Sequence, residues 1–362
     1  MRRTPRHLLV PVAFSVAYLL VFPILTGREL VIQRSWAVPV ASAPVVSDSV
    51  RTAGVLLPVR FDDSFAYVSD DGAVIYRGAI TYRVALAGRG FISFGRTPDQ
   101  LVLQNPDGSY LATIPQSGYP QFIGAGLFVM SGRDTVVTAY SLGGEPRWRE
   151  SLEGPLSSIC ADGGITVLGL LSGGIVAIDD TGERIDIEGV DNRYAITVYG
   201  SAIHALSGTV AAVLGPTDPA LVLYDLRNNR FTPSLRIDLR GNPSSSMAVE
   251  MTRDGQYVVF DDRGVRMVRV ASGAESAVPT RYPLEQIETG VGFGLVATLG
   301  LGEERDPQRG FRLPAEFVLF DHDGVVPVRA AFSADRAFLS TTDGNSYLGI
   351  DDRVLRFKMG VE

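Results

Sequence analysis

Short apolar runs of four to six residues recur along most of the chain, and a polar turn follows each of them. The seven runs span residues 65–69, 101–104, 135–140, 175–178, 220–224, 265–270 and 316–320. The turns are Asp70-Asp71-Gly72, Pro106-Asp107-Gly108, Leu142-Gly143-Gly144, Asp180-Thr181-Gly182, Asn228-Asn229, Ser272-Gly273 and Asp323-Gly324. A second apolar run follows most of these turns, which is the pattern of a β-hairpin.

The turns return at a drifting period, from 36 residues between Gly72 and Gly108 to 51 residues between Gly273 and Gly324. A period of this size made only of strands indicates a stacked or radial repeat. One repeat holds four candidate strands, at residues 121–125, 127–130, 135–140 and 145–152. Four antiparallel strands joined by tight turns are typical of a β-propeller blade. The sequence therefore predicts an all-β propeller of four-stranded blades.

The number of blades depends on how the chain ends are used. Seven turns favour seven blades, with strands from both chain ends pairing to close the ring. The C-terminal stretch holds further candidate strands at residues 337–340, 346–350 and 354–359. These either complete a blade begun by residues 55–59 and 65–69 or form an eighth blade, so we expect seven blades with eight as the alternative.

The N-terminal segment has the features of a membrane-targeting signal. Residues 8–25 carry no charge, and Arg2, Arg3 and Arg6 precede them. An apolar stretch of this length behind a basic flank favours an uncleaved signal anchor, a transmembrane helix within residues 1–27. The arginines place the N-terminus in the cytoplasm and the rest of the chain outside it. We expect a single-pass protein of the bacterial inner membrane with its propeller in the periplasm, and a secreted or periplasmic protein with a cleaved signal as the alternative.

The remaining chain divides into two parts. Residues 28–52 contain Pro39, Pro44 and several small residues, which predicts an extended linker, and residues 53–362 form the propeller. The whole chain has 33 basic and 40 acidic side chains, and without the three N-terminal arginines the balance is 30 to 40, or −10. Such a body repels nucleic acid, so no nucleic-acid partner is expected.

One repeat resembles a known family. Residues 137–148 run Val-Thr-Ala-Tyr-Ser-Leu-Gly-Gly-Glu-Pro-Arg-Trp, which is similar to the repeat of PQQ-like propellers. Residues 176–183 match it in part, and residues 252–259 look like a WD40-type repeat. The resemblance implies that Trp148 docks between neighbouring blades and that Gly144 makes the turn before it. It favours the non-enzymatic branch, typified by the propeller subunit of the outer-membrane β-barrel assembly machinery, although this chain has no lipidated cysteine near its N-terminus.

Candidate chemistry is sparse. Cys160 is the single cysteine, so no intrachain disulfide and no cysteine-based zinc site is possible, and a buried structural thiol is expected. His204 lies in an apolar strand and is expected to be a packed or hydrogen-bonded core residue. The acidic turns at 179–182 and 321–324 lack the ligand spacing of a calcium loop. We therefore assign no catalytic, cofactor-binding or metal-binding residue and expect no cofactor.

Two irregular stretches are candidate surfaces for a partner protein. Their residues are Glu303, Glu304, Arg305, Asp306, Arg309, Phe311 and Arg312 in one and Arg240 and Asn242 in the other. The function predicted is a membrane-anchored scaffold that binds a protein of the cell envelope. The alternatives are a quinone- or calcium-dependent propeller enzyme acting on a sugar, alcohol or lactone, and a sensor of a small ligand.

Overall fold

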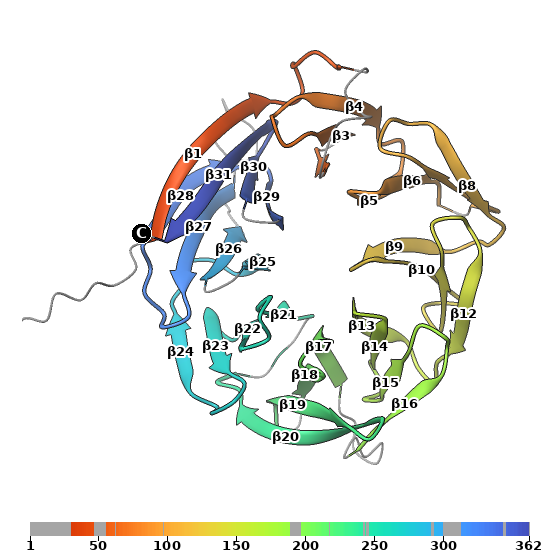
Figure 1. Cartoon of the computed structure of the whole chain (residues 1–362), viewed down its shortest axis with the longest axis vertical. Coiled ribbons are helices and arrows are strands. Elements are labelled where there is room, and N and C mark those ends of the chain that lie inside the picture. The colour runs from red at the N-terminus through yellow and green to blue at the C-terminus, as the bar shows by residue number, and fades with distance from the viewer. Residues whose placement is uncertain are drawn as a thin grey trace, which may run out of the picture.

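The computed structural model of the chain shows sheets standing side by side around a common axis (Figure 1). The structure describes residues 30–361 apart from 47–55, 62, 97, 189–196, 217, 242, 244–245, 291–292, 300–312 and 343–344. Every regular element in these ranges is a β-strand. Among the described residues, no helix has the length and apolar character needed to cross a membrane. The predicted transmembrane helix lies outside the described residues.

The strands follow one another as blades around the ring. Blade 1 contains β2 (Leu57–Arg60), β3 (Ser64–Val68) and β4 (Val74–Ala79). Blade 2 contains β5 (Arg83–Ala87), β6 (Gly90–Phe94), β7 (Leu101–Gln104) and β8 (Tyr110–Ile114). Blade 3 contains β9 (Tyr119–Ile123), β10 (Gly126–Ser131), β11 (Val136–Tyr140) and β12 (Pro146–Ser151). Blade 4 contains β13 (Leu156–Asp162), β14 (Ile165–Leu170), β15 (Ile175–Ile178) and β16 (Arg184–Ile187).

The second half of the ring repeats this order. Blade 5 contains β17 (Thr197–His204), β18 (Thr209–Gly215), β19 (Ala220–Arg227) and β20 (Arg230–Asp238). Blade 6 contains β21 (Val249–Met251), β22 (Tyr257–Asp261), β23 (Val265–Arg269) and β24 (Glu275–Val278). Blade 7 contains β25 (Leu284–Thr289), β26 (Phe293–Leu299), β27 (Leu313–Asp321) and β28 (Val328–Ala334). Blade 8 contains β29 (Ala337–Thr342), β30 (Asn345–Ile350), β31 (Arg353–Val361) and, from the other end of the chain, β1 (Leu30–Pro39).

The prediction of seven blades is wrong. Five sheets are four-stranded, blade 1 is three-stranded, and blades 4 and 5 share one eight-stranded sheet because their perimeter strands β16 and β20 pair in parallel. When each run of consecutive antiparallel strands is counted as one blade, the described residues form eight blades, which is the alternative number expected from the sequence. Six of the seven turns that suggested seven blades join the third and fourth strands of a blade, and the first turn joins the last two of the three strands of blade 1. The closing blade has no such turn, since its third and fourth strands come from opposite ends of the chain.

Strand β1 closes the ring. It pairs antiparallel with β31 from Leu30↔Val361 to Pro39↔Arg353, with one irregularity between Arg34 and Trp36. Closure by both chain ends was predicted, but the segment that performs it was placed in the linker. Residues 30–39 are therefore part of the propeller, because β31 offers them an otherwise unpaired sheet edge.

Blade 1 lacks an inner strand among the described residues. Its last strand, β4, holds the perimeter position. In a complete blade, the turn before the perimeter strand packs against the perimeter strand of the preceding blade, and the turn of blade 2 packs in this way against β4. A Cβ placed on Gly108 of that turn would lie 2.5 Å from the ring of Tyr76 on β4, just as one on Gly182 would lie 2.7 Å from Trp148 on the perimeter strand β12. The chain before β2 that would precede this meander lies outside the described residues.

The core lies between adjacent blades rather than at the centre of the ring. Trp148 is 9% exposed and belongs to a cluster that joins Phe128 of blade 3 to Leu168 and Ile178 of blade 4. Strands near the middle of a blade are covered on both faces by the neighbouring blades, and all seven residues of β18 are buried. Burial on both faces explains why these strands read as continuous apolar runs instead of alternating ones.

Candidate functional site

The inner strands define two mouths of the central channel. Each inner strand runs along the axis, so all of them begin at one face, here called the start face, and end at the other, the end face. A cavity of about 930 Å³ opens where β5, β9 and β13 begin, and we call it the start-face cavity. A second, of about 540 Å³, opens where β17, β21 and β25 end, and we call it the end-face cavity.

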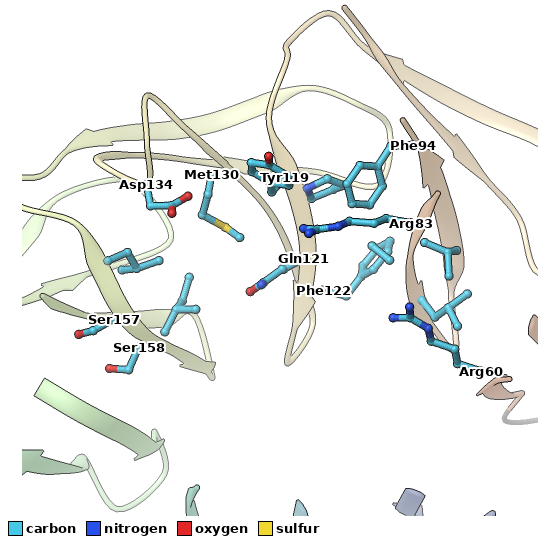
Figure 2. A pocket seen from close by; sticks show the side chains of 16 residues that line it. Arg60, Arg83, Phe94, Tyr119, Gln121, Phe122, Met130, Asp134, Ser157 and Ser158 are labelled. Carbon is cyan, nitrogen blue, oxygen red and sulfur yellow. The ribbon is translucent and has the colours of Figure 1, made fainter. Parts of the chain in front are cut away.

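Residues from the first four blades line the start-face cavity (Figure 2). They are Arg60, Arg83, Val84, Ala85, Leu86, Phe94, Tyr119, Pro120, Gln121, Phe122, Met130, Asp134, Leu156, Ser157, Ser158 and Ile159. The mixture of arginine, aromatic and amide side chains differs from the apolar packing between blades. Such groups at the mouth of a channel can bind a ligand from solvent.

Arg83 is the central side chain of this cavity. Its guanidinium carbon lies 5.4 Å from the ring centroid of Tyr119 and 5.7 Å from that of Tyr82. Tyr119 is itself held edge-on to Phe94, with ring centroids 6.3 Å apart. Figure 2 shows Arg83 extending beside Tyr119 and Phe94, with Arg60 directed into the same space. Cation–π contact fixes the guanidinium while leaving its N–H edge available.

The opposite wall is more neutral. The Ser157 hydroxyl donates to the carbonyl oxygen of Gly169 at 3.0 Å, and the hydroxyls of Ser158 and Ser201 are 3.0 Å apart, so these groups are already satisfied. Among the described residues of the lining, Asp134 is the one carboxylate, and it is exposed. The cavity therefore offers two arginines against a single acid.

The end-face cavity has the opposite character. Glu250 of β21 and Glu288 of β25 both line it, next to the hydrogen bond that the Thr289 hydroxyl donates to the carbonyl oxygen of Met251 at 2.8 Å. Glu250 is exposed to channel water, but the protein of the ring around it desolvates its carboxylate and raises its pKa to about 7, and the like charge of Glu288 adds to this. Burial also raises the pKa of Glu288 to about 7, against the lowering effect of a hydrogen bond from the Gln286 amide at 2.8 Å. This mouth takes up protons near neutral pH.

Basic groups border the acidic pair. Arg253 donates to the carbonyl oxygen of Thr341 at 3.0 Å and lowers the pKa of Glu288. His204 is 2.9 Å from the Ser207 hydroxyl and 3.1 Å from the carbonyl oxygen of Arg253. His204 was expected to be a packed or hydrogen-bonded core residue. It is hydrogen-bonded, but it lies partly exposed at this mouth and not in the core. Within the described ranges, no group of three or more His, Cys, Asp or Glu side chains is placed to hold a metal ion.

The structure places the other predicted residues as follows. Gly144 has φ +84° in the turn before Trp148, and a Cβ there would meet Ala112 of the preceding blade at 3.1 Å. Arg240 is exposed, and its backbone N–H donates to Asp262 at 2.9 Å. The loop residues Glu303, Glu304, Arg305, Asp306, Arg309, Phe311, Arg312 and Asn242 lie outside the described residues. Cys160 is partly buried, and burial raises the pKa of its thiol to about 12.

Sequence reasoning missed the start-face residues. Arg83 and Tyr119 are 36 residues apart, which equals the period between the early turns, and each is the first residue of an inner strand. Aligning the chain by its repeat would have put both at the same face. The acidic pair, Glu250 and Glu288, is 38 residues apart, whereas the turns of the same two blades, at Gly273 and Gly324, are 51 residues apart, so the repeat did not mark this pair.

A ring of antiparallel blades with a cavity at each mouth of its axis defines a β-propeller. The chain belongs to a family of β-propeller proteins, whose model matches residues 3–361. An uncharacterized protein of Treponema pallidum (strain Nichols) is 23% identical over 259 residues, which cover 68% of each chain.

Two solved structures share the fold. The computationally designed Ika8 protein superimposes with a TM-score of 0.58 at 11% identity, covering 84% of this chain and 96% of its own. BamB from Moraxella catarrhalis superimposes with a TM-score of 0.56 at 13% identity, covering 91% of this chain and all of its own. These similarities support the predicted propeller architecture.

Proposed function

We propose that this protein is a binding scaffold of the cell envelope whose start-face cavity docks a partner protein. The observation that carries the proposal is the arginine held between two exposed tyrosines at the mouth of the channel. Tyr82 is 46% exposed and Tyr119 is 40% exposed, although both are large aromatic side chains in contact with Arg83. Tyrosine and arginine are the residue types that contribute most often to the energetic centre of protein interfaces.

The proposal includes membrane attachment through residues 8–25. This stretch is uncharged and follows three arginines, and only residues 26–29 separate it from β1. Since β1 is the perimeter strand of the closing blade, the edge of blade 8 would lie near the bilayer. The PQQ-like repeat around Trp148 and the fold shared with BamB are consistent with the non-enzymatic branch and with a scaffold.

Site-specific photo-crosslinking in living cells tests the docking site. A benzoylphenylalanine residue replaces Tyr82 or Tyr119 in the full-length chain, and Tyr110 serves as the matched control. Tyr110 is 66% exposed but lies on the perimeter strand β8. We expect one envelope protein to be captured from positions 82 and 119 and not from position 110. Capture of nothing, or of the same protein from all three positions, would refute docking at this cavity.

A separate measurement tests the location. Protease added to cells with a permeabilised outer membrane should digest the propeller, and the full-length chain should sediment with the membrane fraction. A chain that resists protease until the inner membrane is broken would contradict the extracytoplasmic placement.

A further inference from the structure

Arg60 and Arg83 are the unusual charges of the start-face cavity. The chain has a net charge of −7, yet both arginines are exposed at one mouth, and neither forms an ion pair with another described residue. Several arginines elsewhere in the described part of the chain do form ion pairs, such as Arg266 with Asp262 at 2.5 Å. Among the described residues, the cavity therefore gathers positive charge on an acidic molecule.

The way Arg83 is held selects the shape of its ligand. Tyr82 and Tyr119 lie against the guanidinium at 5.7 and 5.4 Å, so the N–H groups at its edge remain for a ligand. A planar edge with parallel N–H groups matches the two oxygens of a carboxylate. Stacking also reduces the entropy lost when the long side chain is immobilised on binding.

The rest of the cavity suits a peptide rather than a lone ion. Gln121 is exposed on β9 and presents both an amide donor and an acceptor, the groups that a peptide backbone needs. Phe122, Leu156 and Ile159 add partly buried apolar surface to the lining. At about 930 Å³ the space is at the upper end of the range of ligand pockets, which is enough for several residues.

We infer that the start-face cavity recognises an acidic segment of the partner protein, with an Asp or Glu carboxylate on the guanidinium of Arg83 and with Arg60 as a second contact. This inference rests on the proposed function and names the chemistry of the partner at that site. Asp134 on the same rim disfavours segments of continuous negative charge, so the segment carries one or two acids flanked by apolar or aromatic residues.

Selection from a random peptide library tests the inference without knowledge of the partner. The full-length protein in mild detergent is immobilised, and phage-displayed random dodecapeptides are selected on it. Enriched peptides are then made with a fluorescent label, and their binding is measured by anisotropy to the natural protein and to Arg83→Gln, Arg83→Lys and Arg89→Gln. Arg89 is the matched control because it is exposed in the turn at the other end of β5.

We expect the enriched peptides to contain Asp or Glu, and Arg83→Gln to weaken their binding about 10- to 100-fold, as loss of a hydrogen bond to a charged group does. Arg83→Lys should weaken it less, and Arg89→Gln should leave it within about twofold, since rim charges contribute little. Glutarate should compete with the peptides more strongly than inorganic phosphate. Equal unfolding midpoints of the variants show that they remain folded.

The inference is overturned if no peptide is enriched, if the enriched peptides lack acids, if Arg83→Gln binds them as tightly as the natural protein, or if phosphate competes best. The crosslinking experiment separates this failure from failure of the proposed function. If a partner is captured at position 119 through a segment without acids, the proposed scaffold function is supported and only the inference of acidic recognition is refuted.

Discussion

Replacing Glu288 by Gln should stabilise the propeller at neutral and alkaline pH and leave it unchanged in acid. Glu288 has a pKa of about 7 in the folded protein, mainly because of burial inside the ring, against an ordinary value of 4.5. Between these two pH values the folded state binds more protons than the unfolded state. The free energy of unfolding therefore falls as pH rises from about 4.5 to 7 and is level above that.

The size of the effect follows from the two pKa values. Their difference, about 7 minus 4.5, corresponds to an upper limit of about 3 kcal/mol at 1.36 kcal/mol for each pH unit. Glu288 keeps partial contact with channel water, which screens the charge, so we expect about 1–2 kcal/mol. The Gln286 amide that donates to Glu288 can donate equally to a glutamine oxygen, so the substitution should cost little else.

Urea unfolding of the full-length chain at pH 5, 6, 7 and 8 measures this directly. The advantage of Glu288→Gln over the natural protein should grow across the series and reach about 1–2 kcal/mol at pH 8. Glu145→Gln, at an exposed turn on the perimeter, is the control and should show no pH-dependent difference. Because Glu288 also raises the pKa of Glu250, the double variant Glu250→Gln/Glu288→Gln should gain less than the sum of the two single gains. An advantage that is constant with pH, or one that shrinks as pH rises, would refute the reasoning.

Three further substitutions or reagents probe the blades. Asp262→Ala should cost about 1.5–3 kcal/mol in urea unfolding, because the 4%-exposed guanidinium of Arg266 loses one of its two acids while Glu275 at 2.6 Å still compensates its charge; a loss below about 1 kcal/mol would contradict this. Gly182→Ala should lower stability by about 1–3 kcal/mol, since φ is +93° there and the new Cβ would lie 2.7 Å from Trp148; an unchanged melting temperature would argue against this packing. Cys160, with its thiol pKa raised to about 12, should resist iodoacetamide at pH 8 in the native protein and react after unfolding, as mass spectrometry would show, and rapid native alkylation would disprove the assignment.

The turns were the strongest signal in the sequence. They predicted the propeller class correctly but not the number of blades. The carboxylate of Asp107 accepts the backbone N–H of Ser109, and that of Asp179 accepts the backbone N–H of Thr181. Gly108 and Gly182 take positive φ in the same turns, and both features depend only on near neighbours. Counting these turns missed one blade, since the closing blade has none between β31 and β1. Residues 30–39 looked like a linker because the partner that makes them a strand lies more than 300 residues away.

The candidate site was harder to predict than the fold. Arg83 and Tyr119 stand in different blades, and nothing local to either residue marks it as facing the channel. Glu250 and Glu288 would be ordinary solvated acids on an isolated strand. Both acquire pKa values near 7 because the ring surrounds them with protein, and at Glu250 the like charge of Glu288 adds to this.

By itself the sequence determined most of the strands, the turns that precede the perimeter strands, and hence the propeller class. These features depend on side-chain alternation and backbone preferences over a few residues. The tertiary structure alone decided the number of blades, the strand that closes the ring and the opposite charge of the two channel mouths. Closure and electrostatics depend on distances between residues that are far apart in the chain, and only the curvature of the assembled blades sets those distances.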